Sequence, residues 1–256
     1  MQFKVFVPLA ALLSLQLSFV LAAPVAEAET VDASFELEKR IGTDAGDGTK
    51  AKPYIFNIDC AGVEEVCEAQ CAAILCFKSP SLLQYGGPGS NTAQRTASGA
   101  GSDPFRPPLA TLVGGSKIDL SALKQSTWTS PEDTTNASAK EGGIGCLIAP
   151  VDPGHNTIMV TRLTCASEEG SRVSGQISHY KAKKDEYFKK KYHNAGKYCK
   201  ALDAGKAADT VCKNAPSTDP VNFMYRRTSK KSGNSLLWQH LKYGTDTWAV
   251  NFPGYS

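Results

Sequence analysis

The stretch YIFNIDCAGVEEVCEAQCAAIL, residues 54–75, decides how this chain begins to fold. Apolar residues alternate over 54–58 and predict a short strand. From Val63 to Leu75 the apolar residues recur at helical spacing, and Glu64 and Glu65 occupy the first turn, where the helix dipole favours acidic groups. The stretch therefore predicts a strand followed directly by a helix.

Outward from this unit, local patterns predict further helices, strands and a long loop. One helix is expected over 91–97, capped by Ser90 or Asn91 and ended by Gly99, because these residues suit helix ends. An apolar stripe predicts a second helix within 176–199. The composition of the remaining segments predicts strands at 157–164 and 247–252 and a surface loop at 102–140.

Length and composition point to one globular domain. The chain has 256 residues, of which 41% are hydrophobic, so it can bury a sizeable core and is not mostly disordered. We expect a single compact α+β domain that is stapled by disulfides, in which a small antiparallel sheet packs with helices and long loops.

The first 40 residues read as a leader that is removed. Residues 1–22 have the pattern of a signal peptide, and the propeptide at 23–40 ends in the dibasic pair Lys39-Arg40. A membrane anchor is the alternative, but polar residues interrupt the apolar run. We expect a flexible arm at 41–53, a folded domain at 54–256, and a secreted, extracellular monomer without a membrane segment. Removing three basic and five acidic residues leaves 25 basic against 20 acidic side chains.

The cysteines support this compartment, since all of them follow the dibasic site. They are Cys60, Cys67, Cys71, Cys76, Cys146, Cys165, Cys199 and Cys212. An even count in a secreted chain predicts four disulfides and no free thiol, with the pairing left open. Cys67 and Cys71 share one helix face, so each should pair with a different segment. A zinc site is the weaker alternative, because there is no C-x-x-C pair. Asn136 begins the N-x-S/T sequon and is a candidate glycosylation site.

Familiar catalytic signatures are missing from the sequence, but two acidic clusters remain. There is no G-x-S-x-G, H-E-x-x-H, P-loop or dinucleotide fingerprint. One cluster combines Glu132 and Asp133 with Glu141, and the other is Glu168-Glu169. Carboxylates that converge can bind Mg²⁺ or Mn²⁺ and position water beside a phosphate. Solvated acidic loops are the plainer interpretation of the same residues.

Basic residues gather near the C-terminal end. Eight lysines lie between residues 181 and 200, interleaved with Tyr and Phe, and a second basic cluster follows at 226–231. Such residues can neutralise the phosphates of DNA while aromatic faces stack on bases. The residues singled out as nucleic-acid contacts are Lys181, Lys183, Lys184, Lys190, Arg226 and Arg227. A solvated helix face is the alternative.

Taken together, these segments resemble the secreted deoxyribonucleases called NucA/NucB, in particular their cysteine-rich fungal branch. Residues 58–63 (IDCAGV) with the cysteine helix look like the family's opening unit, and 93–99 (AQRTASG) resembles its arginine-bearing helix. The segment 130–143 is similar to the family's C-D-E-Y-P-F-A-S-x-x-E-G-G, and 168–177 to its E-E-N-x-x-Q-G-G loop.

The resemblance implies metal-dependent hydrolysis of DNA with little sequence preference. It implies a divalent metal (Mg or Mn) held by Glu132, Asp133 and Glu141, and catalytic roles for Glu141, Arg95 and Glu169. The chain departs from the pattern at Pro131, Thr134, Thr135 and Gly170. These departures leave an alternative open, in which the protein has lost its activity and serves as a secreted binding or effector protein on the same scaffold.

Overall fold

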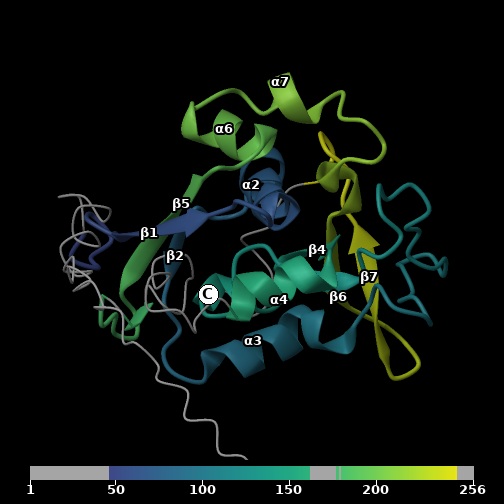
Figure 1. Cartoon of the computed structure of the whole chain (residues 1–256). Helices are drawn as coiled ribbons and strands as arrows, with labels where there is room; N and C mark the ends of the chain where they lie inside the picture. Colours follow the sequence, from purple (N-terminus) through teal and green to yellow (C-terminus); the bar gives the residue numbers. More distant parts are fainter. Residues whose placement is uncertain (1–45, 162–176, 179, 247–256) are drawn as a thin grey trace, which may run out of the picture.

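The computed structural model describes residues 46–161, 177, 178 and 180–246, which form two small sheets with α2 (Glu64–Phe77) between them (Figure 1). The other helices are α3 (Ser90–Ser98), α4 (Pro153–Thr161), α6 (Lys197–Asp203) and α7 (Asp209–Cys212), with 3-10 turns η1 (Ala100–Ser102), η2 (Lys140–Gly142) and η3 (Pro220–Phe223). The strands are β1 (Tyr54–Asp59), β2 (Leu82–Gln84), β3 (Ser130–Asp133), β4 (Leu147–Val151), β5 (Tyr187–His193), β6 (Tyr225–Ser232) and β7 (Ser235–His240). The α+β class is confirmed.

The two sheets differ in strand direction. In the first, with the order β1-β5-β2, β1 pairs in parallel with β5, and β2 pairs antiparallel to β5. The second, with the order β3-β4-β6-β7, is antiparallel throughout. The expected small antiparallel sheet is therefore accompanied by a mixed one, because β5, far along the chain, joins the opening strand.

Helix α2 supplies the centre of the main core. Ten of its 14 residues are buried, among them Val66, Ala69, Ala73 and Phe77. They pack in one cluster with Phe56 and other apolar residues from both sheets. Burial on nearly all sides explains why this helix tolerates so many alanines and cysteines, whose small side chains allow close neighbours.

Three disulfides tie α2 to its surroundings. They join Cys60 to Cys67, Cys71 to Cys199 and Cys76 to Cys212. The last two connect α2 with the helices α6 and α7, more than 120 residues later in the chain. The expectation that Cys67 and Cys71 pair with different segments is confirmed.

Cys146 forms no disulfide with any cysteine in the described part of the chain. It is buried, and its Sγ lies 2.8 Å from Thr135 Oγ1. Burial raises the pKa of this thiol to about 12. Six cysteines form the three disulfides, and the eighth, Cys165, lies outside the described residues, so a fourth disulfide stays a prediction.

Local patterns predicted the first elements well. The strand expected at 54–58 and the helix expected from Val63 are β1 and α2, and the short helix expected at 91–97 is α3. The predicted cap was wrong, however: Gly89 is the N-cap of α3, and the Ser90 hydroxyl donates to the Gly87 carbonyl. Gly99 ends α3 as expected, with a left-handed φ of 85°.

Two predicted elements were wrong in type. The segment expected as a strand from 157 is helical in its described part, because α4 runs through it to Thr161. The Asp152 carboxylate accepts the Gly154 and His155 amides and caps this helix, whose first residue is Pro153. In place of the helix expected within 176–199 the chain forms strand β5 at its centre, in which Phe188 and Tyr192 are buried and Lys189 and Lys191 exposed; only the last residues of that range belong to a helix, α6. Pairing with β1 overrides the apolar stripe.

Two segments that were expected to be irregular, the loop at 102–140 and the arm before residue 54, contain ordered structure. The loop contains β3, in which Pro131, Glu132 and Asp133 are all buried, because β4 pairs with the strand and α2 packs against it. Residues 46–53 of the expected arm form a turn in which the Asp47 amide donates to Lys52, and Gly48 accepts the Tyr187 amide.

Several expectations fall on residues outside the described part. They concern the signal peptide, the propeptide, residues 41–45 of the arm, Glu168, Glu169 and the strand at 247–252. Among the helices of the described residues, none is both long and apolar enough to span a membrane.

Candidate functional site

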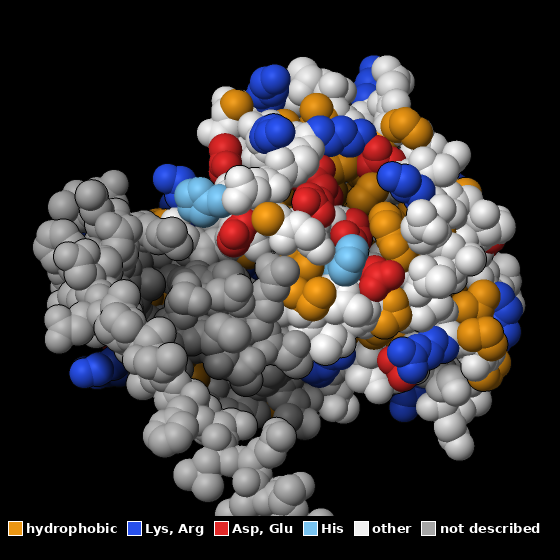
Figure 2. Space-filling model, in the orientation of Figure 1, with side chains coloured by type: hydrophobic (Ala, Val, Ile, Leu, Met, Phe, Trp, Pro, Cys, Tyr) orange, Lys and Arg blue, Asp and Glu red, His pale blue; other side chains and the backbone are white. Residues whose placement is uncertain are grey.

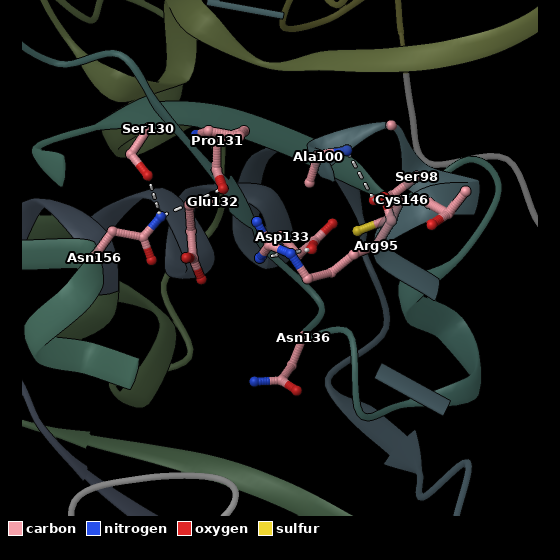
Figure 3. Close-up of polar contacts among 12 residues, drawn as sticks. Arg95, Ser98, Ala100, Ser130, Pro131, Glu132, Asp133, Asn136, Cys146 and Asn156 are labelled. Carbon is pink, nitrogen blue, oxygen red and sulfur yellow. Dashed lines mark hydrogen bonds and ion pairs between the residues drawn. The ribbon is translucent and has the colours of Figure 1, made fainter. Parts of the chain in front are cut away.

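Two adjacent carboxylates of strand β3 line one cavity. Glu132 and Asp133 pair with Ala149 and Ile148 of β4 and lie at the end of their strand. The cavity measures about 370 Å³, and its lining comes from β1, α2, α3, β3, the loop after β3, and α4. Figure 3 shows Asn156 of α4 holding the start of β3 through Ser130 and the Pro131 carbonyl, at 2.8 and 3.3 Å.

The face shown in Figure 2 has an uneven charge distribution. Acidic side chains gather toward the middle of this face, whereas Lys and Arg lie mainly around it. An acidic centre within a basic periphery is compatible with a cation bound at the centre and a polyanion held around it.

Asp133 is the most deeply buried acidic side chain of the cavity. It is 3% exposed, and burial raises its pKa to about 6, although the positive charge of Arg95 opposes this rise. Arg95 Nη1 lies 3.6 Å from Asp133 Oδ2 (Figure 3). Within the described residues neither carboxylate oxygen of Asp133 has a hydrogen-bond partner. Buried polar atoms are normally satisfied, so these oxygens indicate a place for a ligand.

Glu132 lines the same cavity and is held by α2. Its Oε1 accepts a hydrogen bond of 2.7 Å from Gln70 Nε2. Burial raises the pKa of Glu132 to about 7, and the neighbouring Asp133 charge adds to this effect, whereas Gln70, Lys190 and Arg95 oppose it. The carboxyl group can therefore exchange a proton near neutral pH.

Arg95 reaches the cavity from α3, whose end is fixed against the second sheet. At Gly99 an added Cβ would lie 2.8 Å from the Trp238 ring, so the close approach and the positive φ both require glycine. Arg227 Nη1 donates to the Thr96 carbonyl and attaches the helix to β6. The Arg95 side chain is 39% exposed, which leaves guanidinium edges available to a phosphate.

The structure separates Glu141 from this pair. Glu141 lies in η2, and its Oε2 accepts the Gln84 amide of β2 at 3.0 Å. It does not line the cavity. Within the described residues, no group of three or more His, Cys, Asp or Glu side chains is placed to hold a metal. The expected set of Glu132, Asp133 and Glu141 therefore does not form, because the η2 turn uses the third carboxylate to anchor β2.

The sequon residue Asn136 lies beside the carboxylates. It lines the same cavity, with a left-handed φ of 78°, and its Oδ1 accepts the Ser138 amide. Its neighbour Ala137 is 6% exposed, so the stretch is less exposed than a glycosylated loop would be. A glycan on Asn136 would stand in the cavity.

The predicted nucleic-acid contacts divide into three environments. Lys181, Lys183 and Lys184 are exposed on the turn before β5. Lys190 points inward and donates to Gln70 Oε1 and the Thr134 carbonyl at 2.7 and 3.1 Å. The Arg226 guanidinium donates to Gln239 of the neighbouring strand.

The aromatic residues near these lysines do not form a stacking surface. Phe188, Tyr192 and Tyr198 are buried, and Tyr180 and Tyr187 are half-buried. Of the proposed groove, the exposed lysines remain available, whereas Lys190 belongs to the acidic cavity.

Sequence reasoning missed Gln70 and Asn156. Both are buried polar side chains that hold β3 in place. A signal for Gln70 was present, because Glu68 and Gln70 lie among the apolar and small residues that follow the first turn of this helix. Polar residues inside such a helix need internal partners.

We compared the chain with known protein families, curated proteins and solved structures. No family model, curated protein or solved structure matches the chain, so the resemblance rests on the quoted motifs.

Proposed function

We propose that this protein is a secreted, metal-dependent deoxyribonuclease that cleaves DNA in the cavity between α2, α3 and β3. The observation that carries the proposal is the pair of buried carboxylates on β3, of which Asp133 has no hydrogen-bond donor in the described part of the chain. Two carboxylates cost free energy when they are buried together, so a compensating cation gives a reason for the arrangement.

The donor set fits a hard divalent cation. Mg²⁺ is commonly held by one or two carboxylates, with water and substrate oxygens completing its shell. Asp133 and Glu132 would be the protein ligands. When bound, such an ion offsets charge on a phosphate and activates water.

The other side chains of the cavity have separate tasks. Arg95 binds phosphate oxygens with its exposed guanidinium edge and holds the phosphate over β3. Asn156 fixes the start of β3, and Glu141 anchors η2 to β2, so that the carboxylates keep their positions. Glu141 thus becomes a positioning residue, although the resemblance implied a catalytic one.

Plasmid nicking in Mg²⁺ or Mn²⁺ tests the proposal. Asp133→Asn keeps the shape but removes the charge, so it should lower the nicking rate at least about 100-fold, as for other preorganised electrostatic groups. Chelation should abolish nicking. Asp103→Asn is the matched control, because Asp103 is exposed near α3 and lies outside the cavity lining; it should leave the rate unchanged.

A degenerate binding protein is the second candidate, and a specific observation favours it. Arg95 already pairs with Asp133, and the Glu141 carboxylate already accepts a backbone amide. A site whose charges are satisfied internally needs no metal. If the unmutated protein shows no metal-dependent nicking above the Asp133→Asn variant, this second function replaces the first.

A further inference from the structure

Gln70 stands at the centre of a buried network that joins both sheets. Its Oε1 accepts hydrogen bonds from Lys190 Nζ at 2.7 Å and from the Tyr192 hydroxyl at 2.9 Å. Its Nε2 donates to Glu132 Oε1 at 2.7 Å. Gln70 is 3% exposed and Tyr192 4%, so water has little access to these bonds.

The chemistry of the partners fixes which way the Gln70 amide points. A lysine ammonium group can only donate, so it must face the amide oxygen and never the amide nitrogen. Tyr192 adds a second donor on the same oxygen. With the oxygen held from β5, the NH₂ group has one orientation left, toward Glu132.

We propose that Gln70, oriented by Lys190 and Tyr192, is a positioning residue that holds the Glu132 carboxylate in place at the cavity. The proposal deepens the nuclease function and rests on it for its catalytic meaning. Groups behind a metal ligand or reacting carboxylate commonly set its orientation in this way. β5 thereby contributes to the site although, of this relay, only Gln70 and Glu132 line the cavity.

Lys190 is the lysine of β5 that turns inward, toward Gln70. The neighbouring lysines 189 and 191 are exposed, and alternation along the strand turns Lys190 to the inner side. Burial of an ammonium group is costly unless it is compensated, and here the compensation consists of the Gln70 and Thr134 oxygens near the Glu132 charge.

The orientation of the amide can be measured without any activity. The side-chain NH₂ protons of Gln70 should be protected from exchange with solvent in an NMR spectrum of the whole protein. Lys190→Met and Tyr192→Phe should each speed this exchange, and the double variant should do so at least about tenfold. Lys189→Met and Tyr187→Phe are the matched controls on the same strand and should leave it unchanged.

Tyr192→Phe removes only a hydroxyl and keeps the buried ring, so it tests the network if Lys190→Met does not fold. Equal protection in Tyr192→Phe and in the unmutated protein, or an equal loss in the β5 controls, would overturn the positioning role.

Activity separates this inference from the nuclease proposal. Gln70→Met should lower kcat for nicking about tenfold with little change in KM, and Lys190→Met in that background should add less than about twofold, because both act through one amide. Independent, multiplicative losses would contradict the relay. If Gln70 is protected as described but the unmutated protein does not nick DNA, the nuclease proposal fails while the fixed orientation of Gln70 stands.

Discussion

β3 and β5 lie in different sheets, and each sends a charged side chain to Gln70, yet they treat charge in opposite ways. β5 is densely basic, but lysines 189 and 191 point to solvent and only Lys190 turns inward. β3 has only two charged residues, and both are buried at one cavity. The density of charge along a sequence is therefore a poor guide to a site, whereas the burial of charge is a good one, because burial is costly and must be compensated.

The largest effect that would test this contrast is the dependence of stability on pH. The pKa of Asp133 is about 6 in the folded protein against the ordinary 3.8 of an aspartate side chain, so the folded state binds this proton more tightly. The protonated Asp133 carboxyl group therefore contributes fully to stability below about pH 4, and this contribution is lost as the pH rises through 6. The shift corresponds to about 3 kcal/mol.

Urea unfolding in EDTA, without reductant, measures this pH dependence of the free energy of unfolding. The difference in the free energy of unfolding between the unmutated protein and Asp133→Asn should fall by about 2 kcal/mol from pH 4 to pH 7, because the unfolded carboxyl is already partly ionised at pH 4. A difference that is constant with pH would mean that Asp133 is not desolvated as the structure describes.

A smaller effect is expected from the charged residues of β5. Lys190→Met should lower the free energy of unfolding by about 2 kcal/mol at pH 7, because it removes two hydrogen bonds from a buried charge and leaves Glu132 less compensated. Lys191→Met, one residue later and exposed, should change it by less than about 0.5 kcal/mol. Equal effects would erase the distinction between the two sides of the strand.

The smallest effect concerns the exposed lysines before β5. If Lys183 and Lys184 each neutralise one phosphate, changing both to Ala should reduce the log–log slope of DNA binding against salt by up to about 1.8, with the fold and the cavity intact. Binding to a duplex oligonucleotide in EDTA measures the slope without cleavage. Lys117→Ala with Lys124→Ala is the exposed control pair outside this segment. An unchanged slope would identify the lysines of 181–184 as solvated surface.

Prediction from sequence succeeded where short-range chemistry decides the structure. Glu64 and Glu65 at the start of α2, and Gly99 at the end of α3, mark helix ends by local interactions alone. It failed at β5, because the stripe of Tyr180, Phe188 and Tyr192 fits a helix as well as a strand until β1 offers a pairing partner. At α4 the start signal Asp152-Pro153 was present but overlooked beside β-branched residues.

For the site, the sequence pointed to Arg95, Glu132 and Asp133, and the structure brings these three together. The sequence also pointed to Glu141, but this residue lies outside the cavity, because the η2 turn places its carboxylate at the Gln84 amide. The surroundings of Gln70 in the sequence indicate a buried polar residue but not its partners, because these come from β3 and β5, more than 60 and about 120 residues away.

The sequence by itself determined the strand–helix unit at 54–75, the disulfide framework as a class, and the set of acidic and basic residues that could carry chemistry. These follow from spacing, capping and composition, which act over a few residues. Tertiary structure alone decided which cysteines pair, which lysine turns inward and which carboxylates share a cavity. Those outcomes depend on contacts between distant segments, and they are selected by the free energy of burying polar groups with the right partners, which no local pattern records.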